Sequence, residues 1–285
     1  MHMKNLYHPI TATPFKHNAS YMELTPCPAL RPYIRCFWGS TEPVASSDAP
    51  GLVIPDTCMD IIFRLDYTRQ TIVGSFCAMD ERAYLPRDRQ ADRAVTSTFA
   101  IRFYAWTASL FTEHPLTGSK NQVFAVGDFF SALEKELKPM LMSVASLDQR
   151  AEIASRYLMR RLDEHRMNST LMNAVHQIIC ARGTMKIADL AARNAVSRKR
   201  LERVFDEYMG LSPKSFSSLT RYQLLWQELC FGQRHDMLDL VEKYGYFDQS
   251  HLLNDFKHHH TLTPAQAVRL ARADVAFLQD FLPGI

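Results

Sequence analysis

The sequence predicts an α+β protein: a mainly β N-terminal domain of the sandwich or barrel type, a helical connector, and an all-α C-terminal domain. Three observations predict this arrangement. Up to about residue 127 short apolar runs alternate with turn residues, and beyond it the apolar residues recur at helical spacing. In addition, the skeleton LERVFDEYMGLSP at 201–213 recurs 51 residues later as LLNDFKHHHTLTP at 252–264.

The composition favours a globular cytoplasmic protein. With 285 residues, 47% of them hydrophobic, the chain is long enough for two domains with full cores. Its first 15 residues lack the pattern of a signal peptide, and no later run approaches the roughly 18 apolar residues of a membrane span. The six cysteines lack CxxC spacing, as expected of reduced thiols. We therefore expect no export, no membrane contact, no metal and no cofactor.

Residues 1–127 are interpreted as the β-rich domain. Runs such as CMDIIFRLDY, TIVGSF and STFAIRFYAW are rich in β-branched and aromatic residues and are bounded by Gly, Pro and Asp. Residues 128–167 then carry two longer segments with apolar residues at helical spacing and an acidic residue near each start. They predict a helical connector, which is also a possible dimerisation surface.

Residues 168–285 predict helices and tight turns throughout. The repeated skeleton indicates two helix-turn-helix units, the first at about 186–210 and the second at about 236–260. Ser197 and Asp248 stand at equivalent positions, where each can cap the second helix of its unit. The repeat therefore indicates one three-helix architecture used twice.

A long helix is expected between the two units, over residues 213–231. Ser212 can cap it and Pro213 suits its first position. At 1.5 Å per residue this helix is about 30 Å long, which is close to the roughly 34–36 Å between successive major-groove segments on one face of DNA. Its length suits a strut between two DNA-binding units.

The two predicted recognition helices differ in charge. Between Asn168 and Arg272 there are 14 basic against 10 acidic residues, and four cations cluster at the start of the first recognition helix. Cations there oppose the helix dipole, which favours a role with DNA phosphates and guanine edges. The candidate DNA-binding residues are Arg198, Lys199, Arg200 and Arg203 in the first unit and Gln249, Ser250, His251, Asn254 and Lys257 in the second.

Residues 170–270 resemble the AraC/XylS family of bacterial transcription regulators. The matching stretches include Gly210-Leu211-Ser212-Pro213 in the first unit and Leu262-Thr263-Pro264 in the second. The resemblance implies double-stranded DNA and RNA polymerase as partners and a homodimer as a possible assembly. Thr261 departs from the pattern, because the family commonly has a helix-ending glycine there. Asp255 and the Leu240-Val241 pair are further departures.

The N-terminal segment IPDTCMDIIFRLD resembles the sensor domain of one subgroup of these regulators, in which Pro-Asp-Gly-Cys-x-Asp precedes an apolar strand. Thr57 replaces the glycine of that pattern. We favour a pocket for a small-molecule effector. Its candidate lining residues are the aromatic residues Phe37, Trp38, Phe63, Phe76, Phe103, Tyr104 and Trp106, and the alternative is that these rings fill the core.

Two other roles compete for this segment. Asp56, Cys58 and Asp60 could form a catalytic or metal cluster, but residues alternate in a strand, and a cysteine among apolar residues is usually packed in the core. No enzymatic activity is therefore expected. The alternative function is a redox or electrophile sensor, or a Cys alkyl acceptor, that uses Cys58 or Cys77. For the histidine run 258–260, adjacent helical positions point in different directions, so a metal site is not expected.

Overall fold

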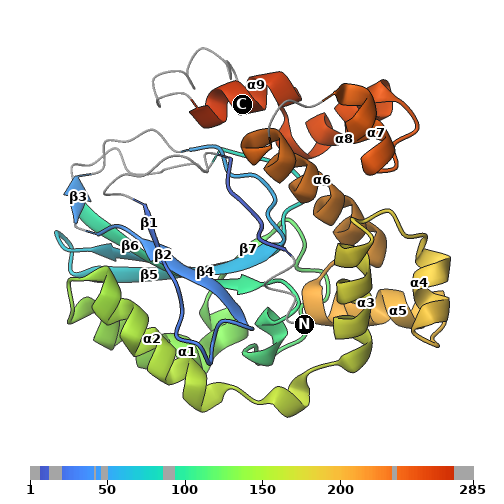
Figure 1. Cartoon of the computed structure of the whole chain (residues 1–285). Coiled ribbons are helices and arrows are strands. Elements are labelled where there is room, and N and C mark those ends of the chain that lie inside the picture. The colour runs from blue at the N-terminus through green and yellow to red at the C-terminus, as the bar shows by residue number, and fades with distance from the viewer. Residues whose placement is uncertain are drawn as a thin grey trace.

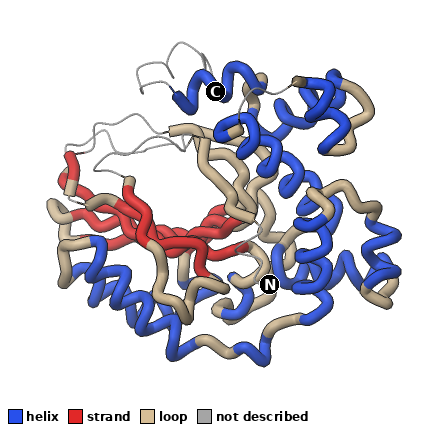
Figure 2. Tube along the Cα trace, in the orientation of Figure 1, coloured by secondary structure: helices blue, strands red, loops and turns tan. Residues whose placement is uncertain are grey.

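The computed structural model describes residues 7–12, 21–41, 43–45, 51–85, 94–232 and 236–272. Its strands end at Ala125 and its α-helices begin at Gly127, which confirms the α+β class (Figures 1 and 2). Among the described residues, no helix is both long enough and apolar enough to cross a membrane.

The strands form one antiparallel sheet of seven strands within the described residues. Their order is β1-β2-β6-β4-β5-β7, and β3 also pairs with β6. Helices, rather than a second sheet, cover one face of it (Figure 1). The strands are β1 (Met22–Leu24), β2 (Ile34–Gly39), β3 (Val44–Ala45), β4 (Cys58–Asp66), β5 (Thr71–Cys77), β6 (Val95–Tyr104) and β7 (Val123–Ala125).

The two faces of the sheet differ in chemistry because side chains alternate along a strand. On β4, Met59, Ile61 and Phe63 are fully buried and belong to the apolar core beneath the sheet. The predicted connector helices, α1 (Gly127–Met142) and α2 (Leu147–Arg161), cover this face (Figure 1). Asp60 and Arg64 alternate with these residues along β4, so they belong to the opposite face, which carries polar and charged side chains.

The C-terminal region consists of seven α-helices in the described residues. They are α3 (Ser169–Cys180), α4 (Ile187–Arg193), α5 (Arg198–Met209), α6 (Pro213–Phe231), α7 (Met237–Lys243), α8 (Gln249–His260) and α9 (Pro264–Arg272). Two short 3₁₀ helices, Ala108–Leu110 and Glu164–Arg166, lie before them in the chain. Figure 1 shows α6 running between the group α3 to α5 and the group α7 to α9.

The hydrophobic core continues from the sheet into the helices. Trp106, which follows β6, packs edge-on against Phe216 of α6 with 6.1 Å between ring centroids, and Phe216 in turn contacts Phe205 of α5. A second cluster around Trp226 of α6 includes Leu52 and Ile54 from the N-terminal half. Both helix-turn-helix units are therefore packed against the N-terminal domain.

Candidate nucleic-acid interface

The first helix-turn-helix unit holds its recognition helix, α5, on a buried apolar stripe. Leu201, Val204, Phe205 and Met209 are buried and form this stripe, and Tyr208 beside them is half-buried. The Ser197 hydroxyl accepts a hydrogen bond from the Arg200 N–H at 3.1 Å, which confirms the predicted cap. The remaining face of the helix is free of the core, and its four exposed cations are Arg198, Lys199, Arg200 and Arg203.

The second unit repeats this construction around α8. The Asp248 carboxylate accepts from the His251 N–H at 2.7 Å, which confirms the predicted cap. The Asp236 carboxylate caps α7 by accepting from the Leu238 N–H at 2.9 Å. Leu252 and Phe256 are fully buried. The predicted DNA-binding residues of this unit all have exposed side chains, namely Gln249, Ser250, His251, Asn254 and Lys257.

The turn of the second unit is anchored by a polar network. The Tyr246 hydroxyl donates to Asp255 at 2.8 Å, and Arg221 of α6 pairs with the same carboxylate at 2.9 Å. The Arg221 guanidinium also lies 4.3 Å from the centre of the Tyr246 ring, within cation–π distance. Asp255 thus connects the recognition helix to the strut helix.

The strut helix α6 joins the two units as predicted. Ser212 caps it by accepting from the Ser215 N–H at 3.0 Å, and Pro213 occupies its first turn. At 19 residues it is about 28 Å long. Its buried residues extend from Pro213 to Cys230, and Tyr222 and Trp226 among them are fully buried.

The N-terminal domain contacts the C-terminal end of α5. The Leu116 N–H donates to the Glu207 carbonyl at 2.8 Å. Gly210, which ends α5 with a left-handed φ of +67°, lies so close that an added Cβ would sit 2.7 Å from the Leu116 carbonyl oxygen and 2.3 Å from Ser119 Oγ. A side chain at this position would therefore disturb the domain contact.

The same domain contacts the C-terminal end of α8. The Ala83 N–H donates to the His259 carbonyl at 2.7 Å, and His259 Nδ1 lies 2.7 Å from the Glu81 carbonyl oxygen. Burial lowers the pKa of His259, so this ring nitrogen donates as a neutral imidazole N–H. Both recognition helices thus have their C-terminal ends on the N-terminal domain and their N-terminal turns exposed.

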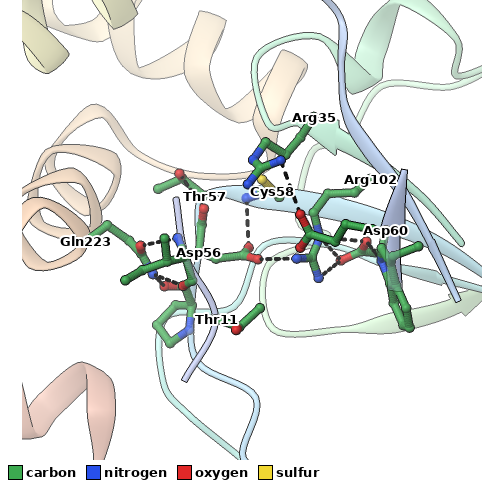
Figure 3. Close-up of polar contacts among 12 residues, drawn as sticks. Thr11, Arg35, Asp56, Thr57, Cys58, Asp60, Arg102 and Gln223 are labelled. Atoms are coloured by element: carbon green, nitrogen blue, oxygen red, sulfur yellow. Dashed lines mark hydrogen bonds and ion pairs between the residues drawn. The ribbon is translucent and has the colours of Figure 1, made fainter. Parts of the chain in front are cut away.

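A third contact holds the middle of α6. The buried Gln223 amide accepts from the Ile10 N–H at 2.9 Å and donates to the Ile10 and Pro55 carbonyls at 3.1 and 2.8 Å. The Trp226 indole N–H donates to the Thr11 carbonyl at 3.0 Å. Figure 3 shows Gln223 on one side of the Asp56–Cys58 segment, with Arg102 and Asp60 on the other.

That segment leads into an ion cluster on the sheet face opposite the helices. Arg102 forms a two-pronged pair with Asp60, at 3.0 and 3.1 Å, and reaches Asp56 at 3.3 Å (Figure 3). The Trp38 indole donates to Asp60 at 2.7 Å. Burial raises the pKa of Asp56 against the opposing effect of Arg102, and burial followed by the nearby Asp56 and Asp60 charges raises the pKa of Asp80 to about 7.

The aromatic residues predicted to line an effector pocket divide between several environments. Phe63, Phe76 and Phe103 are fully buried on the helix-covered side; both Phe76 and Phe103 contact Phe130 of α1. Phe37 also lies there, stacked on Phe99. The other three lie elsewhere. Trp38 and Tyr104 lie on the opposite face of the sheet, the face that carries Arg102, and Trp106 lies at the junction with α6.

Three of the thiols, Cys36, Cys58 and Cys77, lie in environments that disfavour the reactive thiolate. Burial raises the pKa of Cys36 and of Cys58, and it raises the pKa of Cys77 to about 12. Because the thiolate is the nucleophile, such thiols react slowly at neutral pH. This environment weighs against the alternative of a thiol-based sensor.

Two histidines of the run at the end of α8, His259 and His260, are buried, whereas His258 is exposed. His260 is fully buried, stacks on Phe256 with centroids 5.0 Å apart, and has Nδ1 2.8 Å from the Tyr222 hydroxyl. Burial lowers the pKa of His260 to about 3. Among the described residues, no group of three or more His, Cys, Asp or Glu side chains is arranged to hold a metal ion.

Two family profiles match the chain. A profile described as a helix-turn-helix domain matches residues 190–269, a range that contains both α5 and α8. A profile described as a domain of unknown function (DUF6597) matches residues 22–125, which contain all seven strands. A comparison with curated proteins gives no significant match.

Solved structures with similarity to the chain are distant. A transcriptional regulator from Chromobacterium violaceum, described among AraC-type DNA-binding domain-containing proteins, is 22% identical over 37% of this chain and 95% of that one, with a TM-score of 0.34. ToxT from Vibrio cholerae is 12% identical over 84% and 99%, with a TM-score of 0.42. ToxT with a bound unsaturated fatty acid is 12% identical over 82% and 95%, with a TM-score of 0.39.

Sequence reasoning missed the residues that join the two domains. Gln223 and Trp226 fall within the predicted strut helix, whose pattern gives them no separate role, and no pattern in the sequence marks Arg102. A signal for Gln223 existed, because it is a polar residue on the same helical face as Tyr222 and Trp226. A buried amide must find hydrogen-bonding partners, but the sequence did not indicate that these partners are backbone groups of residues 10 and 55.

Proposed function

We propose that the protein is a bacterial, cytoplasmic, sequence-specific DNA-binding transcription regulator. The observation that carries this proposal is the pair of helix-turn-helix units on one strut helix, each with the N-terminal turn of its recognition helix exposed. An α-helix fits the major groove of B-DNA, and the N-terminal residues of a recognition helix contact the base edges there. We propose no catalytic step for the chain.

The proposed contacts follow the side chains of each recognition helix. In the first unit, Lys199, Arg200 and Arg203 read base edges and Arg198 contacts phosphate. In the second, Lys257 approaches the backbone, and the base-reading residues are Gln249, Ser250, His251 and Asn254. All of these side chains are exposed. RNA polymerase is the proposed protein partner, and a homodimer the proposed assembly.

Footprinting tests the DNA-binding proposal. The full-length protein is mixed with a random-sequence duplex pool, and the bound duplexes are footprinted at two salt concentrations. We expect protection of two major-groove segments about one helical turn apart, with binding that weakens steeply with salt. Selection of no sequence, in the presence or absence of small-molecule extracts, would overturn the proposal.

We further propose that a small-molecule effector binds the sheet face that carries Arg102. Trp38 and Tyr104 are the two predicted aromatic residues on that face, and its charged cluster connects directly to the DNA-binding half. Asp56 pairs with Arg102, the neighbouring Pro55 carbonyl accepts from Gln223, and the Thr57 hydroxyl lies 2.8 Å from the Tyr7 hydroxyl. An effector that disturbs the ion cluster would thus shift the contact with α6, and with it the arrangement of the two units.

Gln223→Leu tests this connection. Loss of the amide is expected to speed hydrogen exchange at the Ile10 N–H, which donates to Gln223, and to change affinity for the selected duplex. Leu238→Ala, on the exposed surface of α7, is the matched control and should change neither quantity. Slow exchange at Ile10 together with unchanged DNA affinity in Gln223→Leu would remove this contact from the coupling.

Mass spectrometry after treatment with an alkylating agent tests the thiol alternative. We expect Cys58 and Cys77 to stay unmodified in the folded protein, because burial raises the pKa of both thiols. The exposed Cys180 is the internal control. Rapid and stable alkylation of Cys58 in the folded protein would instead favour an alkyl acceptor.

A further inference from the structure

The turn of the second helix-turn-helix unit contains one residue more than the turn of the first. The first helices of the two units begin 50 residues apart, at Ile187 and Met237, whereas the recognition helices begin 51 residues apart, at Arg198 and Gln249. The additional residue therefore lies in the second turn, between the end of α7 and the cap of α8.

Backbone geometry identifies the additional residue as Phe247. Ala195 and Gly245 both have positive φ, +53° and +63°. The next residue in each unit, Val196 or Tyr246, donates its N–H to the carbonyl five residues earlier, at 3.1 and 2.9 Å. The N-caps Ser197 and Asp248 also correspond. Phe247 lies between Tyr246 and Asp248 and has no counterpart in the first unit.

The side chain of this additional residue is unusually exposed. Phe247 is 90% exposed, the highest value among the large apolar side chains that the structure describes as exposed. Both neighbours of Phe247 in the chain are fixed in place. Tyr246 is buried and hydrogen-bonded to Asp255, and Asp248 caps α8. The Phe247 N–H also donates to His251 Nδ1 at 3.3 Å. The ring is thus held in solvent at the N-terminal end of the recognition helix.

We infer that Phe247 is a base-reading residue that packs against the methyl group of a thymine in the major groove. This inference rests on the proposed function. Of the groups on a DNA duplex, the thymine C5-methyl is the apolar one exposed in the major groove, and phenylalanine is among the side chains that contact it. An uncharged aromatic ring gains little binding energy from contact with phosphates. Insertion of an apolar side chain between base steps is a feature of minor-groove binding.

Replacement of thymine by deoxyuridine tests the inference, because it removes only the methyl group. Each thymine in the half-site protected by the second unit is replaced in turn within the duplex selected by the wild-type protein. One replacement is expected to weaken wild-type binding about fourfold, the effect of burying about one methyl group. The Phe247→Ala variant should bind the thymine and deoxyuridine duplexes equally.

Two controls separate the possible failures. Leu238→Ala removes another exposed apolar side chain of the same unit, at 63% exposure, and should retain the fourfold effect. Wild-type protein that binds its selected duplex but tolerates every deoxyuridine would overturn the role of Phe247 alone, as would a Phe247→Ala variant that keeps the sensitivity. Absence of any selected duplex would instead overturn the proposed function. The deoxyuridine series on wild-type protein needs no variant, so a folding defect of Phe247→Ala leaves the test intact.

Discussion

The two helix-turn-helix units share a backbone plan but differ in what their equivalent residues do. Arg203 of the first recognition helix corresponds to Asn254 of the second, Met209 to His260, and Gly210 to Thr261, with the same 51-residue separation throughout. The first unit places charge at the predicted DNA face and a glycine at the domain contact. The second places hydrogen-bonding groups at its predicted DNA face, a buried histidine in its core, and a threonine at its helix end.

The backbone conformation at the end of each recognition helix is common to both units, whereas the residue type there depends on what packs against it. Both helices end in a left-handed residue, with a φ of +67° in each case. In the first unit the close approach of residues 116–119 requires glycine, whereas Thr261 is exposed and has room for its side chain. The left-handed ending is therefore common to the fold, and the need for glycine is specific to the first unit.

The largest expected effect comes from reversing charge in the first unit. Arg203→Glu should weaken binding to the selected duplex by more than about 3 kcal/mol, since it removes one base contact and adds repulsion from phosphates. Arg203→Asn, which copies the second unit, should cost about 1–3 kcal/mol. Binding is measured by titration, with exposed Arg156→Glu on α2 as the control for net charge. Unchanged affinity in Arg203→Glu would remove α5 from the interface.

A side chain at the first helix end is expected to be next in size. Gly210→Ala should destabilise the protein by about 2–4 kcal/mol, because the new Cβ combines an unfavourable left-handed φ with overlap against the Leu116 carbonyl. Denaturant unfolding measures this change. Thr261→Ala at the equivalent position is the control and should cost far less. Equal losses at both positions would contradict the difference between the two helix ends.

Acid should affect the second unit through His260. Its folded-state pKa of about 3 lies below the ordinary value of 6.5, so the unfolded chain binds a proton that the folded chain excludes. Stability from this group is complete above about pH 6.5 and is lost as the pH falls toward 3, by about 2 kcal/mol at pH 5. His260→Met, which copies Met209, should remove this part of the loss.

Unfolding curves at pH 7 and pH 5 measure that contribution as a difference between wild type and variant. His259 and His8 also have lowered pKa values, so the variant should keep part of the acid sensitivity. Equal losses of stability between pH 7 and pH 5 in wild type and His260→Met would contradict the contribution assigned to His260.

The smallest effect is a gain. Thr261→Gly should stabilise the protein by up to about 1 kcal/mol, because glycine adopts the left-handed region without steric cost. The Thr261 hydroxyl donates to its neighbouring His260 carbonyl at 2.5 Å, a local bond whose loss should cost little. Thermal unfolding at pH 7 measures the change, and destabilisation would indicate that the threonine makes a contribution beyond its backbone.

Sequence periodicity predicted the helices and caps well, because these depend on local chemistry. Ser197, Asp248 and Ser212 each accept the backbone N–H that their positions suggested. The exposed predicted DNA-binding side chains followed from the same reasoning, since the apolar stripe of a helix fixes its other face. The additional residue at Phe247 was missed, because only the backbone conformation of the two turns shows where the alignment shifts.

Spacings of a few residues were enough to predict the α+β division, the duplicated helix-turn-helix plan and the contrast in charge between the recognition helices. They could not predict which aromatic residues lie under the helices, that Arg102 joins Asp56 to Asp60, or that Gln223 bonds to residues 10 and 55. Those contacts join residues between 42 and 213 positions apart in the chain. Alternation along a strand determines which face of the sheet a side chain lies on. Which distant residue it then contacts depends on how the whole chain folds.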